Sequence, residues 1–144
     1  MSIHAEADVI LKLYELRREE TMRKARDWYF AEFNPQNFDE FQAALFGPNS
    51  GHLRMVVSYW DMAAALVNRG AVSQELFTEV NGEHFFVFAK IEPLLSEIRQ
   101  GFGPAFAANL EKLIDATPDG RKRTADTRER IKAIRARMAQ NAHA

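Results

Sequence analysis

Apolar side chains recur three or four positions apart along most of this chain of 144 residues. That spacing places them on one face of an α-helix, whereas a half-buried strand needs alternation at every second residue. Most glycines and prolines lie between such stretches, and Pro93 lies inside one. The sequence therefore predicts an all-α protein: a single-domain helical bundle of about five to seven helices joined by short connections.

The first predicted helix is long, because neither glycine nor proline occurs between Ile3 and Phe33. It ends at Asn34 and Pro35, since the residue before a proline avoids helical angles. A straight helix of this length would span roughly 45 Å, which is more than a domain of this size needs. We therefore expect a long N-terminal helix that bends or projects one end toward a partner.

Polar caps and glycine stops mark three helices in the middle of the chain. Helices are predicted over residues 37–46, 50–69 and 73–80, with caps at Asn37, Ser50 and Ser73. Gly70 supplies the left-handed residue that ends the second of them.

Proline shapes the remaining predicted helices. A helix over residues 84–99 is apolar nearly all round and should be buried, and Pro93 should kink or split it. Pro104 opens a helix that reaches Ile114, and a last helix runs from Arg121 or Thr124 to Ala139. The runs at 55–60 and 85–88 are short enough to be strands, but neither has a hairpin turn beside it.

Charge is distributed unevenly along the chain. Residues 1–120 hold 11 Lys and Arg against 18 Asp and Glu, whereas residues 121–144 hold 8 against 2, so the formal charges are −7 and +6. We expect an acidic helical bundle over 1–120 and a basic C-terminal helix over 121–144 that is part of the same domain or docked on a partner. A ladder of Glu75, Glu79 and Glu83 could receive this helix, although such ladders are more often solvated.

The basic C-terminal helix carries the candidate binding residues. Ile131, Ile134 and Met138 form a narrow apolar seam at helical spacing. Basic side chains flank the seam on both sides: Arg123, Arg130 and Arg137 on one, Arg128, Lys132 and Arg135 on the other. This arrangement is typical of a helix laid against an apolar groove with an acidic rim. It also suits a nucleic-acid backbone or an anionic bilayer surface, which we rank below docking on protein.

No motif for catalysis or for cofactor binding is present in the sequence. Cysteine is absent, no Glu-x-x-His or His-x-x-x-His pair occurs, and the four histidines are scattered. No glycine-rich phosphate loop is found either. His84 beside Glu83 is the one acid–base candidate, and a histidine there is more often a boundary residue. We predict no cofactor, no metal and no enzymatic activity.

Charged residues interrupt the N-terminal segment, and no window approaches about 18 uninterrupted apolar residues. The sequence therefore predicts neither a secretory signal nor a transmembrane segment. A cytoplasmic protein is the default expectation.

Three hypotheses about function follow. The first is a protein-interaction or oligomerisation module, most simply a homo-oligomer that uses the first helix, the last helix or both. The second is a binder of a small apolar ligand among the aromatic residues Trp60, Phe85, Phe88 and Phe106. The third is nucleic-acid binding through the basic C-terminal helix.

Residues 60–99 carry a loose pattern: an aromatic-rich helix with Trp60, a turn at residues 68–70, Leu76-Phe77, Gly82, Pro93-Leu94-Leu95 and Arg99. This stretch resembles a bacterial family known as a domain of unknown function, number 4760. The resemblance implies a small helical domain with no assigned activity, and it carries over no catalytic residue.

Overall fold

Helices follow one another along the whole described chain, which comprises residues 2–143 of a computed structural model. These residues form one all-α domain with no strand, as predicted. They contain nine α-helices and one 3-10 turn, more elements than the five to seven expected. The helices are α1 Ile3–Arg17, α2 Glu20–Ala31, α3 Phe38–Leu45, α4 Ser50–Asn68, α5 Gln74–Val80, α6 Glu83–Ile91, α7 Leu95–Phe102, α8 Ala108–Ala116 and α9 Gly120–Ala142, with the 3-10 turn η1 at Glu92–Leu94.

The prediction of one long N-terminal helix is wrong, because the chain breaks between α1 and α2. The side chain of Glu19 caps α2 by accepting a hydrogen bond from the Met22 amide at 3.1 Å. Leu13 and Met22 are both buried. In one continuous helix nine residues turn the chain by about 900°, so these two side chains would point in opposite directions. The break lets both face the core, and the longest helix of the fold is instead α9.

Two of the three predicted caps are confirmed. Asn37 Oδ1 accepts from the Glu40 amide at 2.9 Å, and Ser73 Oγ accepts from the Leu76 amide at 3.2 Å. The prediction for Ser50 is wrong: it is the first residue of α4, after Asn49, and no side chain caps this helix.

Pro93 splits the predicted helix over residues 84–99, as expected. It lies in η1, which separates α6 from α7. Pro104, by contrast, does not open α8, which begins four residues later. Ala107 adopts a left-handed conformation there (φ 54°), so the chain turns sharply before it becomes helical.

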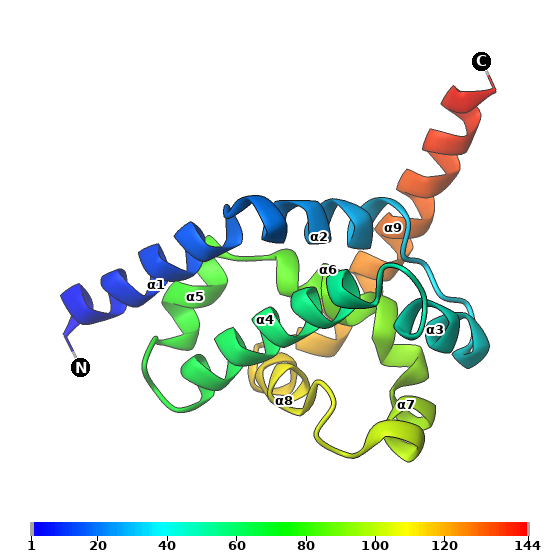
Figure 1. Ribbon diagram of the computed structural model, residues 1–144. Coiled ribbons are helices and arrows are strands. Elements are labelled where there is room, and N and C mark those ends of the chain that lie inside the picture. The colour runs from blue at the N-terminus through cyan, green and yellow to red at the C-terminus, as the bar shows by residue number, and fades with distance from the viewer. Residues whose placement is uncertain (1, 144) are drawn as a thin grey trace.

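The core is built around α4, which packs between α2 and α8 and also contacts α3, α5 and α6 (Figure 1). The largest fully buried side chains of the core are aromatic, and each lies on a different helix from α2 to α6: Tyr29, Phe41, Trp60, Phe77 and Phe88. α9 packs on α6 and α8 with its first half, and its second half extends past the end of α2 (Figure 1).

The start of α9 is fixed by a close backbone contact. Gly120 is buried, and a Cβ atom added there would lie 1.8 Å from the carbonyl oxygen of Ile114. Only glycine allows α8 and α9 to approach this closely. The contact sets the direction in which α9 leaves the bundle.

Candidate functional groove

A surface groove of about 1200 Å³ lies between α2, α6 and α9. Its apolar lining comes from all three helices: Phe30 and Ala31, Phe85 and Phe86, and Ile131, Ile134 and Met138. Charged residues of both signs border it, among them Asp27, Asp126, Arg123, Arg130 and Arg135. An open groove with an apolar floor and a charged rim suits an extended or helical binding partner.

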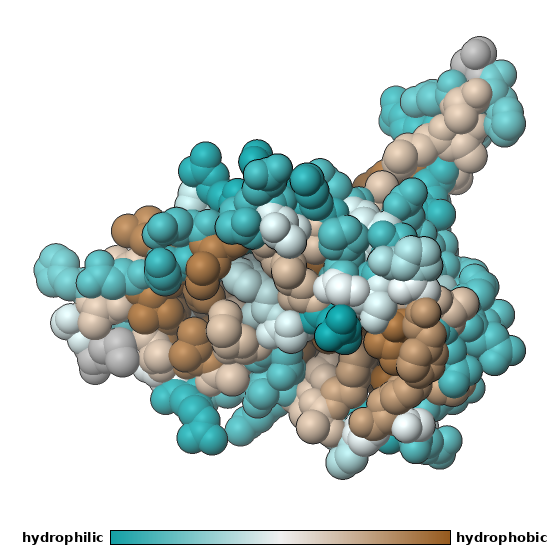
Figure 2. All heavy atoms as spheres, in the orientation of Figure 1, coloured by the Kyte–Doolittle hydropathy of each residue, from teal (hydrophilic) through white to brown (hydrophobic). Residues whose placement is uncertain are grey.

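The two halves of α9 differ in burial. Thr124, Thr127 and Ile131 are buried against the bundle, whereas Ile134 is 49% exposed and Met138 57% exposed. We call residues 132–142 the projecting half of α9. Figure 2 shows the end of this half standing out from the rest of the surface. The apolar seam predicted from the sequence is therefore present, but the bundle buries only its first residue, Ile131.

Two basic side chains that line the groove donate hydrogen bonds to backbone carbonyls at the C-terminal end of α2. Lys90 Nζ donates to the carbonyl oxygens of Tyr29 and Phe33 at 2.7 Å each, and to that of Phe30 at 3.2 Å. Arg135 Nη1 donates to the carbonyl of Ala31 at 3.3 Å. The last turn of a helix leaves its carbonyls without partners and carries partial negative charge, so it favours cations. Burial and the charge of Arg135 lower the pKa of Lys90 to about 8.

The remaining predicted side chains of α9 have separate environments. Arg123 lies over the ring of Phe85, with its guanidinium carbon 4.3 Å from the ring centre. Arg130 donates to Thr127 Oγ1 at 3.0 Å, and Lys132 pairs with Glu129 at 3.2 Å, so both contacts are within α9. Arg137 is exposed. Of the nine predicted binding residues, the groove brings together six: Arg123, Arg130, Ile131, Ile134, Arg135 and Met138.

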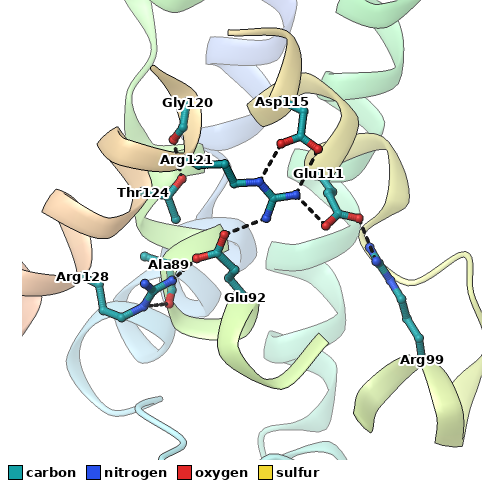
Figure 3. A network of polar contacts seen from close by, with 9 residues as sticks. All are labelled: Ala89, Glu92, Arg99, Glu111, Asp115, Gly120, Arg121, Thr124 and Arg128. Atoms are coloured by element: carbon teal, nitrogen blue, oxygen red, sulfur yellow. Dashed lines mark hydrogen bonds and ion pairs between the residues drawn. The ribbon is translucent and has the colours of Figure 1, made fainter. Parts of the chain in front are cut away.

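Arg128 serves a different purpose, because it anchors the docked half of α9. It bonds to Glu92 and donates to the carbonyl of Ala89 at 2.9 Å (Figure 3). Glu92 also accepts from Arg121 at 2.7 Å, and Arg121 reaches Glu111 and Asp115 of α8. Arg121 was not among the predicted binding residues. Its carboxylate partners lie on η1 and α8, which no spacing within α9 could reveal.

Replacing Glu92 with glutamine is expected to lower the free energy of unfolding by about 2 kcal/mol, because both Arg121 and Arg128 lose a half-buried carboxylate. Urea unfolding measures this change. Hydrogen exchange should also quicken in the first turns of α9. The matched control is Glu129→Gln, whose partner Lys132 is exposed and whose expected change is below about 0.5 kcal/mol. Equal stability of the two variants would contradict an anchoring role for Glu92.

The glutamate ladder does not receive the basic helix. Glu83 is held by Arg26 through hydrogen bonds of 2.6 to 3.1 Å and by the indole of Trp60 at 3.2 Å. Its neighbour His84 has no exposed surface and packs against the rings of Trp60, Phe77 and Phe85. Neither ring nitrogen of His84 has a hydrogen-bond partner. Burial, together with the charge of Arg123, lowers the pKa of His84 to about 4.

The four aromatic residues proposed to enclose a ligand do not share one site. Trp60, Phe85 and Phe88 are buried and Phe106 is partly buried, and only Phe85 among them lines the groove. The residues that sequence reasoning missed are those of α2 and α6, above all Asp27, Phe30 and Phe86. Phe86 belongs to a helix that was expected to be buried, and the groove forms only where α9 leaves the bundle.

Within residues 2–143, no three His, Asp or Glu side chains are placed to hold a metal ion together. None of the helices in this range combines the length and the apolar character that crossing a bilayer requires.

The sequence profile of one protein family, described as a domain of unknown function (DUF4760), matches residues 2–117. The match covers α1 to α8 and stops before α9. No curated protein and no solved structure matches the chain. The match extends well beyond residues 60–99 on both sides and includes most of the protein. The chain therefore belongs to the DUF4760 family.

Proposed function

We propose that this protein is an interaction module without catalytic activity, which binds an amphipathic helix of a partner protein in the groove between α2, α6 and α9. The bound helix presents an apolar stripe to the groove, and carboxylates border that stripe. In helix-in-groove binding of this kind, the groove recognises apolar residues that recur at helical spacing on the partner.

The exposure of Ile134 and Met138 carries this proposal. Both continue the seam that begins at buried Ile131, and both line the groove. The projecting half contains Lys132, Arg135 and Arg137 and no acidic residue. A helical segment of this length is marginal in water without packing, so a partner would stabilise it. The positive charge selects a partner with carboxylates beside its apolar stripe.

The absence of catalysis is supported by the state of the one acid–base candidate. Glu83 is occupied by Arg26 and Trp60, and His84 has no exposed surface from which to reach a substrate. A cytoplasmic location and the lack of a cofactor stay predictions. Nucleic-acid binding and binding of a small apolar ligand stay alternative predictions.

Two designed helical peptides test the proposal. They share one leucine stripe, which glutamates border in the first peptide and lysines in the second. We expect the glutamate peptide to bind more tightly, and to weaken as salt is raised. The double variant Ile134→Glu with Met138→Glu should lower its affinity about tenfold or more, because it removes apolar anchors and repels the glutamates. Fluorescence anisotropy of the labelled peptides measures both effects.

The matched control is Met62→Glu, which changes an apolar residue of α4 that is also exposed and does not line the groove. It should bind the glutamate peptide as the wild type does. Equal affinity for the two peptides, or full binding by the double variant, would overturn the proposal.

A further inference from the structure

A second exposed apolar surface lies on α1, where Arg17 and Arg18 lie over the ring of Tyr14 at its C-terminal end. Ile3 is 61% exposed, Leu11 62% and Tyr14 47%. At about 100° per residue these three side chains fall within about 80° of one another, so they form one stripe. The face of α1 next to this stripe is held to the bundle, where Leu13 is buried and Glu6 accepts from the Ser73 amide at 2.6 Å. Figure 2 shows apolar residues at this end of the molecule, far from α9.

The charges beside this stripe match those of the groove. Asp8 and Glu15 border it on the solvent side, and Arg18 lies at its C-terminal end. All three side chains are exposed. The stripe with its carboxylates has the chemistry that the groove selects.

Lengths and directions also agree. α1 has 15 residues and is about 22 Å long, and the groove follows α9 from Arg123 to Met138, also about 22 Å. Asp8 and Arg18 are separated by about 15 Å along α1, and Asp126 and Arg137 by about 16 Å along α9. An antiparallel arrangement therefore sets Asp8 against Arg137 and Arg18 against Asp126, and in this register Leu11 lies beside Ile134 while Ile3 lies past Met138. Asp126 already pairs with Lys122, but this ion pair is exposed and weak, so Arg18 of a second copy can replace Lys122 as its partner.

We propose that the helix bound in the groove is α1 of a second copy of this chain, antiparallel to α9, with its exposed stripe on Ile134 and Met138. This inference rests on the proposed function, and names its partner. The contact joins two different surfaces, so copies associate head to tail, either as a reciprocal pair or as a longer chain. Direct pairing of two copies of α9 would instead set Arg130, Lys132, Arg135 and Arg137 against their own counterparts, which repel.

Two variants that each break one side of the contact test the inference. Ile3→Lys with Leu11→Lys changes the α1 stripe, and Ile134→Glu with Met138→Glu changes the groove. All four positions are exposed, so both variants should keep the circular dichroism and thermal unfolding of the wild type. Sedimentation should show the wild type exceeding the 16.5 kDa of one chain as concentration rises from micromolar to millimolar, while each variant stays at the mass of one chain.

Mixing the two variants is the decisive measurement. The α1 variant keeps an intact groove and the groove variant keeps an intact α1, so an equimolar mixture should form a complex of one copy of each. A wild type that stays monomeric over the whole range overturns the inference, as does a mixture that forms no complex or an α1 variant that associates as the wild type does. If the wild type is monomeric while the glutamate peptide still binds, this inference falls and the proposed function stands.

Discussion

Replacing Lys90 with methionine should lower the free energy of unfolding by about 3 kcal/mol. Lys90 is buried, and its ammonium group is the donor to three carbonyls at the end of α2. Methionine keeps the length of the side chain and its apolar stem. The variant therefore leaves these carbonyls without their donor and changes little else.

Urea unfolding at neutral pH measures this effect. The matched control is Lys24→Met, because Lys24 is exposed on the same α2 and pairs only with exposed Glu20. The expected change for the control is below about 0.5 kcal/mol. If Lys90→Met unfolds at the same urea concentration as Lys24→Met, the three bonds contribute no net stability.

Replacing His84 with leucine should remove a pH dependence of stability. The ordinary pKa of histidine is about 6.5, and burial lowers that of His84 to about 4 in the folded protein. Between these two values the unfolded chain binds a proton that the folded chain excludes. The free energy of unfolding therefore falls as pH drops through this window, by about 2 kcal/mol at a pH near 5 and about 3 kcal/mol near 4.

The comparison between pH 7.5 and 5 isolates this residue, as an order-of-magnitude effect of about 2 kcal/mol. The carboxyls with lowered pKa values, those of Glu19, Glu111 and Asp115, lose their contributions at more acid pH. The wild type and the control His4→Gln, at an exposed position, should both weaken over this range. His84→Leu should weaken less by that amount. An identical slope in all three proteins would show that His84 is not held neutral by burial.

Most helices could be predicted from spacing and caps. The caps of α3 and α5, the end of α4 before the left-handed Gly70 and the break at Pro93 follow from local rules, because capping and backbone geometry act within a few residues. A bend in the first helix was one of two alternatives left open, but its division into α1 and α2 at residues 18–19 was not predicted, although its signal was present: Leu13 and Met22 are half a helical turn out of phase. Spacings of three and four look helical one by one, even where their summed rotation places two apolar side chains on opposite faces of a continuous helix.

The candidate groove was predicted only in part. The apolar seam on α9 and its flanking arginines were visible, because both are properties of one helix. Phe30, Phe86 and Asp27 were not, because they join the site from two other helices. The separate roles of Arg121 and Arg128 as anchors were equally hidden.

Helical periodicity, the stops at glycine and proline, and the opposed charges of residues 1–120 and 121–144 are all local or additive properties, so the order of residues is enough to establish them. The division of α9 into a docked half and a projecting half is different in kind. It depends on where η1 and α8 place Glu92, Glu111 and Asp115, and on the close approach of Gly120 to Ile114. The hydrogen bonds from Lys90 to the carbonyls of Tyr29 and Phe33 depend in the same way on where α2 ends. Contacts between segments far apart in the chain arise from packing in three dimensions, because a distance between two helices is not a property of either helix alone.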